Sequence, residues 1–88
     1  MEVKGKVGGS IKMTPEQCRM ARAALNLGVR ELATLAHAST NTIARFERGE
    51  QLKGSTMQRV QAALEEAGID FIPEDDGGVG VRLRKGAR

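Results

Sequence analysis

Aromatic residues and cysteine are scarce in this chain, and their scarcity limits both its core and its chemistry. There is no Trp or Tyr and there are only two Phe among 88 residues, so a core must be built from aliphatic side chains and methionine. Cys18 is the only cysteine, which excludes an intrachain disulfide and a cysteine-based metal cluster. A lone thiol is typical of a reducing compartment. A chain of this length predicts one small domain.

Long apolar runs are also missing. No stretch approaches the roughly 18 consecutive apolar residues of a membrane span, and MEVKGKVGGSIKM at the start has no apolar centre of a signal peptide. These absences predict a cytoplasmic protein without a membrane partner. We expect residues 1–13 to form a flexible arm, because they show neither a helical nor a strand period.

Residue combinations typical of catalytic and metal sites are absent as well. His37 is predicted in a tight turn and Cys18 at a core position of a helix, so they do not predict a nucleophile–base pair. Residues 74–76 (EDD) lack the spaced ligands of a calcium loop, and residues 77–80 (GGVG) lack the Lys-Ser/Thr of a phosphate loop. We therefore expect no enzyme, no metal and no cofactor.

The net charge of +3 is unevenly distributed along the chain. Residues 14–59 hold seven basic and four acidic side chains, and residues 60–76 hold six acidic and no basic ones. Residues 77–88 then hold four basic and no acidic side chains. This segregation favours contact of one side with a polyanion, although a generic solvated surface would give a similar total.

Capping and periodicity signals predict four helices. Thr14 with Gln17, and Ser55 with Gln58, have the spacing of a capping box, and Ser39 is a further N-cap residue. Helices are therefore expected at about 14–25, 29–37, 39–48 and 55–67.

The second and third helices are separated by a very short connection. Residues 37–39 are too few for antiparallel packing, so the two helices should cross at a large angle. We expect the second helix to face the core with Leu32, Leu35 and Ala36.

Beyond Gly68 the period changes from helical to alternating. Residues 69–71 (IDF) and 79–84 (VGVRLR) alternate in polarity and flank a turn-type segment, 73–78. This pattern predicts a β-hairpin over residues 69–84, followed by a basic tail over 85–88. The predicted fold class is mainly α, with four helices and a C-terminal hairpin. Since an isolated hairpin is marginal in water, it must cover the fourth helix or complete a sheet across a two-fold axis.

The helix at 39–48 has two distinct faces. Ile43 and Phe46 form an apolar face suited to anchoring the helix on a core. The opposite face carries Asn41 and Arg45, whose side chains match the major-groove edges of adenine and guanine. Short hydroxyl side chains lie near the helix N-terminus, namely Ser39, Thr40 and Thr42. Basic side chains placed for phosphates follow farther along the chain, namely Arg48 and Lys53.

Residues 27–50, LGVRELATLAHASTNTIARFERGE, resemble the DNA-binding core of the lambda-repressor-like (XRE/Cro-type) helix-turn-helix family. The matching features are Leu32 with Ala33, Leu35 with Ala36, Ser39, Thr42 with Ile43, and the ending Glu47-Arg48-Gly49. The resemblance covers about residues 13–68 and implies a DNA-binding domain at 14–68. It places the helix-turn-helix at 29–48 and the recognition helix at 39–48.

The resemblance also implies a role for each matching position. Base reading falls on Thr40, Asn41 and Arg45. Backbone contacts fall on Ser39, Thr42 and Lys53. Arg30 replaces the contact that the family usually makes at the start of its second helix. Arg22 and Glu47 fall on a salt bridge that joins the first and third helices.

Three positions depart from the family pattern. Gly28 and Val29 stand where a Ser/Thr cap and a Gln are usual, which removes one expected backbone contact. His37 stands at a turn position usually occupied by Gly, so some backbone strain is expected there. Ala38 replaces a larger apolar residue of the turn.

These features together predict a sequence-specific regulator of transcription that binds double-stranded DNA. A repressor acting as a homodimer on a palindromic operator is the simplest form. An antitoxin that uses the same domain for autoregulation, and binds a toxin through the acidic segment and hairpin, is an alternative. A helical protein-interaction module without DNA binding is a second alternative.

Overall fold

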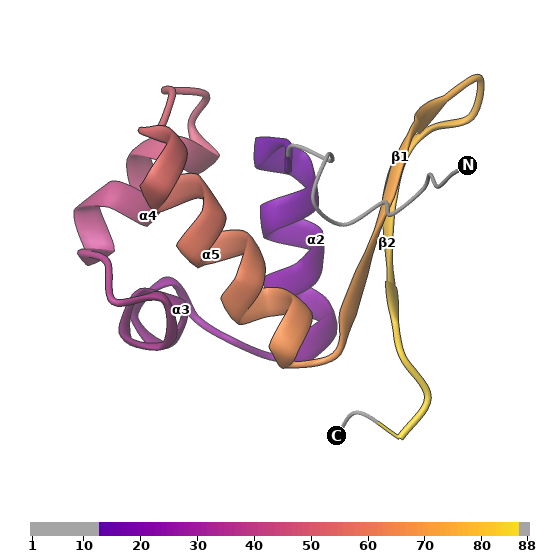
Figure 1. Ribbon diagram of the computed structural model, residues 1–88, viewed down its shortest axis with the longest axis horizontal. Helices are drawn as coiled ribbons and strands as arrows, with labels where there is room; N and C mark the ends of the chain where they lie inside the picture. The colour runs from indigo at the N-terminus through magenta and orange to yellow at the C-terminus, as the bar shows by residue number, and fades with distance from the viewer. Residues whose placement is uncertain (1–12, 87–88) are drawn as a thin grey trace.

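The computed structural model describes residues 13–86 as four helices followed by an antiparallel hairpin (Figure 1). The predicted mainly α class with a C-terminal hairpin is confirmed. Within residues 13–86, none of the helices combines the length and the apolar character needed to cross a bilayer. The elements are α2 (Pro15–Leu25), α3 (Val29–Ala36), α4 (Thr40–Glu47), α5 (Gly54–Glu66), β1 (Ile69–Asp75) and β2 (Gly78–Leu83).

Two of the predicted helix caps are present. The Thr14 hydroxyl accepts from the Gln17 backbone N–H at 3.1 Å, and the Gln17 side chain accepts from the Thr14 N–H at 3.0 Å. The Ser39 hydroxyl accepts from the Thr42 N–H at 3.0 Å. The box predicted at Ser55 is wrong, because α5 begins one residue earlier, at Gly54, and has no side-chain cap.

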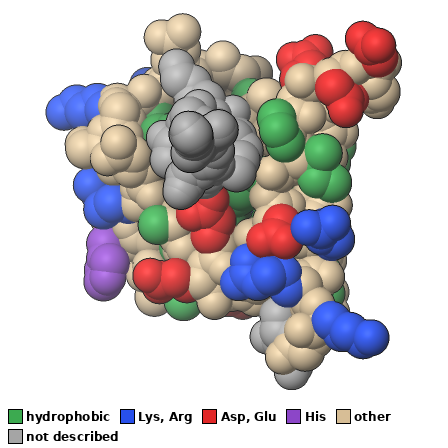
Figure 2. Space-filling model, turned by 45° about the vertical axis from the view of Figure 1, so that its right-hand side comes forward, with side chains coloured by type: hydrophobic (Ala, Val, Ile, Leu, Met, Phe, Trp, Pro, Cys, Tyr) green, Lys and Arg blue, Asp and Glu red, His purple; other side chains and the backbone are tan. Residues whose placement is uncertain are grey.

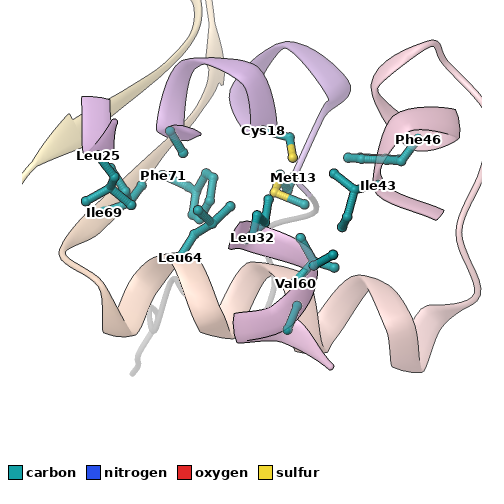
Figure 3. Packing of buried hydrophobic residues seen from close by; sticks show 13 residues of the cluster. Met13, Cys18, Leu25, Leu32, Ile43, Phe46, Val60, Leu64, Ile69 and Phe71 are labelled. Carbon is teal, nitrogen blue, oxygen red and sulfur yellow. The ribbon is translucent and has the colours of Figure 1, made fainter. Parts of the chain in front are cut away.

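All four helices and β1 contribute to one hydrophobic core (Figure 3). Leu32, Ile43 and Leu64 are fully buried in it. The prediction for Leu35 is wrong, since this side chain is 49% exposed. The buried face of α3 is formed by Leu32, Ala33 and Ala36, and the turn of about 100° per residue places Leu35 on the flank of that face.

The core begins earlier than the sequence predicted. Met13, assigned to the flexible arm, is only 2% exposed. Its backbone N–H donates to the Gln61 side-chain oxygen at 3.3 Å, which fixes it against α5. The rest of the predicted arm, residues 1–12, lies outside the described residues, as does the end of the basic tail at 87–88.

The hairpin packs along α2, and β1 also contacts α5. Ile69 pairs with Leu83 and Phe71 with Val81, and Ile69 and Phe71 are buried. The strand β1 continues through Pro73 to Asp75, where the sequence predicted a turn. The pairing is irregular between Ile72 and Asp75, which accommodates the proline within the strand.

Candidate nucleic-acid interface

Helices α3 and α4 are joined by three residues and lie at a large angle to one another. Figure 1 views α3 nearly along its axis, whereas α4 runs across the view. His37 ends α3 in the left-handed conformation, with φ 55° and ψ 45°. The next residue, Ala38, donates its N–H to Ala33 O at 2.9 Å. This tight reversal is the reason that α4 leaves α3 sideways rather than antiparallel to it.

A basic side chain from α5 holds this turn in place. Arg59 donates through Nε to Ala36 O at 3.2 Å and through Nη2 to His37 O at 3.3 Å. Both acceptors belong to the C-terminal end of α3, where a cation is electrostatically favoured. Sequence reasoning missed this contact, because no local pattern links Arg59 to residues more than 20 positions earlier.

The inner side of α4 is anchored by two apolar side chains and one ion pair. Ile43 is fully buried and Phe46 is 3% exposed, and both side chains extend into the core (Figure 3). Arg22 of α2 donates to both carboxylate oxygens of Glu47, through Nε at 2.8 Å and Nη2 at 2.7 Å. The structure thus contains the contact between α2 and α4 that the family resemblance implied.

The ion pair is shielded from water and linked to further groups. The Glu47 side chain is 8% exposed and the Arg22 side chain 21%. Arg22 Nη1 also donates to Leu27 O at 3.1 Å, which ties the loop after α2 to the same guanidinium. Arg19 donates to the backbone oxygen of Glu47. These contacts fix the end of α4 relative to α2.

The electrostatics of the pair follow from these contacts. Burial acts to raise the pKa of Glu47, but hydrogen bonds from Arg22 and Cys18 and the charges of Arg22 and Arg19 outweigh it, so the pKa is lowered. The hydrogen bond to Glu47 raises the pKa of Arg22. Burial, followed by the contact with Glu47, raises the pKa of the Cys18 thiol. Cys18 is therefore a protonated partner of the ion pair rather than a reactive thiolate.

The outer side of α4 presents the side chains that the sequence assigned to base reading. Thr40, Asn41 and Arg45 are all exposed, and the Arg45 side chain is 53% exposed. A hollow of about 350 Å³ separates the end of α4 from the start of α5. Its lining includes Thr42, Arg45, Lys53 and Thr56, so a second basic group stands beside the α4 face.

A carboxylate that the sequence reasoning missed occupies this face. Glu50 accepts from Arg45 Nε at 2.8 Å, and its second oxygen lies 3.9 Å from Arg48 Nη2. The spacing of five residues between Arg45 and Glu50 is not a helical neighbour spacing, so only the loop geometry after α4 brings them together. A ligand that binds Arg45 through Nε therefore competes with the Glu50 carboxylate.

The remaining predicted backbone contacts lie at the starts of α3 and α4. The Ser39 and Thr42 hydroxyl oxygens lie 2.8 Å apart, and both groups stand at the N-terminal end of α4. Arg30 is exposed in the first turn of α3. The Gly28 N–H donates to the Glu31 carboxylate at 2.9 Å, which replaces part of the missing cap of α3.

Comparisons with known proteins do not decide the identity of this site. No family model matches the chain, and no curated protein is significantly similar to it. Within residues 13–86, no group of three or more His, Cys, Asp or Glu side chains is arranged to hold a metal ion. The assignment of a function therefore depends on the geometry of α4 and its surroundings.

Proposed function

We propose that the protein is a sequence-specific DNA-binding regulator of transcription that acts as a homodimer, with α4 as its recognition helix. The observation that carries this proposal is the two-sided construction of α4. One side is fixed by buried apolar residues and the Arg22–Glu47 pair. The other exposes Thr40, Asn41 and Arg45, which are side chains suited to reading base edges.

The surroundings of α4 support the same proposal. Lys53 and Arg45 line one hollow, so a phosphate next to a base contacted by α4 would find a cation within reach. The hydroxyl groups of Ser39 and Thr42 lie at the N-terminal end of the helix, where the helix dipole also favours an anion. A solvated helix in a protein-interaction module requires neither arrangement.

Binding to duplex DNA tests the proposal. A preferred site is first selected from random duplexes, and the affinity is then measured by fluorescence anisotropy over a range of salt concentrations. The affinity should fall steeply with salt, because cationic side chains displace counterions from the phosphates. If no duplex binds more tightly than a neutral polymer does, the result would instead support the alternative function, a protein-interaction module without DNA binding.

Two variants separate base reading from backbone binding. Arg45→Ala should cost about 1–3 kcal/mol on the selected site and relax the preference at one base pair. Lys53→Ala should weaken all duplexes about equally and reduce the salt slope by about one. Arg82→Ala is the charge-matched control, since Arg82 lies on the hairpin in an ion pair with Asp70. It should change neither the affinity nor the preference by a comparable amount.

A further inference from the structure

The side chain of Gln17 reveals which backbone groups of the hairpin point outward. Its Nε2 donates to Ile72 O at 2.8 Å and to Gly80 O at 2.9 Å, and these two residues lie opposite each other. One nitrogen reaches both oxygens only if they lie between the strands, as in a hydrogen-bonded antiparallel pair. The bond from Arg84 N–H to Gly68 O, at 2.7 Å, marks the same kind of pair further along.

Hydrogen-bonded and non-hydrogen-bonded pairs alternate along an antiparallel ladder, so the pairs Ile69–Leu83 and Phe71–Val81 direct their N–H and C=O groups away from the hairpin. On the β1 edge, Pro73 has no N–H, and Ile69 O accepts from Arg84 Nη1 at 3.2 Å. On the β2 edge, the outward residues are Val79, Val81 and Leu83. Within residues 13–86, no hydrogen bond is found for the outward backbone groups of these three residues. On β1 only Phe71 has both outward groups without a hydrogen bond among residues 13–86, whereas β2 has three such residues and is the more open edge.

We propose that the β2 edge pairs with the β2 edge of a second copy of this chain. The two strands run antiparallel about a two-fold axis at Val81, which gives a continuous four-stranded sheet. This surface would supply the dimer of the proposed function. The pairing itself needs no DNA, so only the biological role of this dimer rests on the proposed function.

The register about Val81 also matches the side chains. It places Val81 opposite its counterpart and Val79 opposite Leu83 of the other copy, so all three apolar residues meet apolar residues. These side chains lie on the face that Val81 and Leu83 share with the buried Ile69 and Phe71. Leu83 is 36% exposed in the single chain. Apolar cross-strand pairs of this kind stabilise antiparallel sheets.

The charges of the hairpin favour the same antiparallel arrangement. The tip carries Glu74, Asp75 and Asp76, and the opposite end carries Arg84 and Lys85. Figure 2 shows acidic side chains gathered over the hairpin tip, at the upper right, and basic ones at the lower right. Antiparallel pairing places each acidic tip beside the basic end of the other copy. A parallel arrangement would place like charges together.

The position of the helices agrees with a dimer on one duplex. All helices lie on one side of the hairpin (Figure 1). The two-fold axis between identical antiparallel strands is perpendicular to their sheet, so both sets of helices stay on the same side. Both copies of α4 then lie on the face of the dimer that is opposite the sheet.

The first test uses the unmodified full chain without DNA. Sedimentation velocity over a concentration series should show a monomer–dimer equilibrium. Amide hydrogen exchange, followed by NMR, should slow about tenfold at Val79, Val81 and Leu83 once roughly 90% of the chain is dimeric, since these amides then exchange only from the monomer. The Phe71 amide, on the other edge, should not respond. A chain that stays monomeric, or a dimer that leaves these three amides unprotected, would overturn the proposal.

Variants of the edge give the second test. Val81→Pro removes an outward N–H from each copy and should raise the dimer dissociation constant at least about tenfold. Val81→Thr, which keeps the N–H and suits a strand, is the matched control and should retain most of the dimer. Circular dichroism establishes that both variants are folded. If Val81→Pro dimerises as tightly as Val81→Thr, the interface lies elsewhere.

A charge exchange tests the register without touching the backbone. Asp76→Lys and Lys85→Glu should each weaken the dimer several-fold, and the double variant should recover most of the loss, because opposite charges again meet. Absence of recovery would refute the antiparallel register.

Removing residues 1–12 tests whether this segment of the same chain, rather than a second copy, pairs with the β2 edge. If this removal converts a monomer into a dimer, the edge belongs to that segment and the proposal is wrong.

Discussion

Replacement of Glu47 by Gln tests whether the buried ion pair holds α4 in place. The substitution keeps the size of the side chain and removes the charge that accepts both hydrogen bonds from Arg22. Breaking a fully buried pair costs about 3–5 kcal/mol. Since the Arg22 side chain is 21% exposed, water recovers part of its solvation, and we expect a loss of about 2–3 kcal/mol. For a domain of this size, this loss corresponds to a fall of roughly 10–20 °C in Tm.

Chemical denaturation followed by circular dichroism measures this loss, and Glu50→Gln provides the control. Glu50 pairs with Arg45 at a similar distance, 2.8 Å, but both side chains are about half exposed. An exposed pair of this kind contributes less than about 1 kcal/mol. If the Glu47 and Glu50 variants lose the same small amount of stability, burial does not strengthen the pair and the reasoning fails.

The pH dependence of stability independently tests whether ionised Glu47 stabilises the fold. The pKa of Glu47 is lower in the folded chain than its ordinary value, so ionised Glu47 stabilises the fold at pH values above that ordinary value. This contribution is lost as the pH falls through the lowered pKa. The difference in free energy of unfolding between the natural chain and Glu47→Gln should therefore shrink in acid. A difference that grows on acidification would contradict the assigned direction.

Three further predictions concern the turn and the exposed face. Glu50→Gln should raise DNA affinity up to about fivefold, because Arg45 no longer has to leave a carboxylate; anisotropy measures this change, and weaker binding would contradict it. His37→Gly should raise the free energy of unfolding by up to about 1 kcal/mol in thermal denaturation, because glycine adopts the left-handed conformation without strain. As a comparison for His37, Asn26 at the end of α2 is also left-handed, and Asn26→Gly should gain less, since Asn tolerates this conformation better. Arg59→Met should lower the stability by about 1–2 kcal/mol in urea, through loss of two bonds to the end of α3; an unchanged midpoint would exclude that role.

Local signals in the sequence predicted most of the fold. The Thr14 capping box and the Ser39 cap formed because each needs only residues three positions apart. The cap predicted at Ser55 is wrong, because α5 already begins at Gly54 and Ser55 lies inside the helix. Met13 was misassigned because its burial depends on Gln61, a residue far along the chain. Patterns within one segment do not contain this contact.

The candidate site likewise has features that local sequence patterns predict and contacts that they do not. The exposed face of α4 follows from its helical period, so Asn41 and Arg45 could be named from the sequence alone. The contacts that set the angle of α4 and occupy its surface come from distant or irregular segments. Arg59 reaches the turn from α5, and Glu50 reaches Arg45 from a loop. The Arg22–Glu47 contact was found only because a family resemblance supplied the long-range pairing.

The ion pairs on the two sides of α4 have opposite consequences for binding. Removal of water from Glu47 strengthens its bond to Arg22, so this contact persists whether or not a ligand is bound. Glu50 and Arg45 remain about half exposed, and water can replace either partner at little cost. The helix is therefore fixed where it meets the core, while its outer arginine can exchange one hydrogen-bond acceptor for another. A phosphate or a guanine edge that displaces Glu50 would use this exchange without moving the backbone of α4.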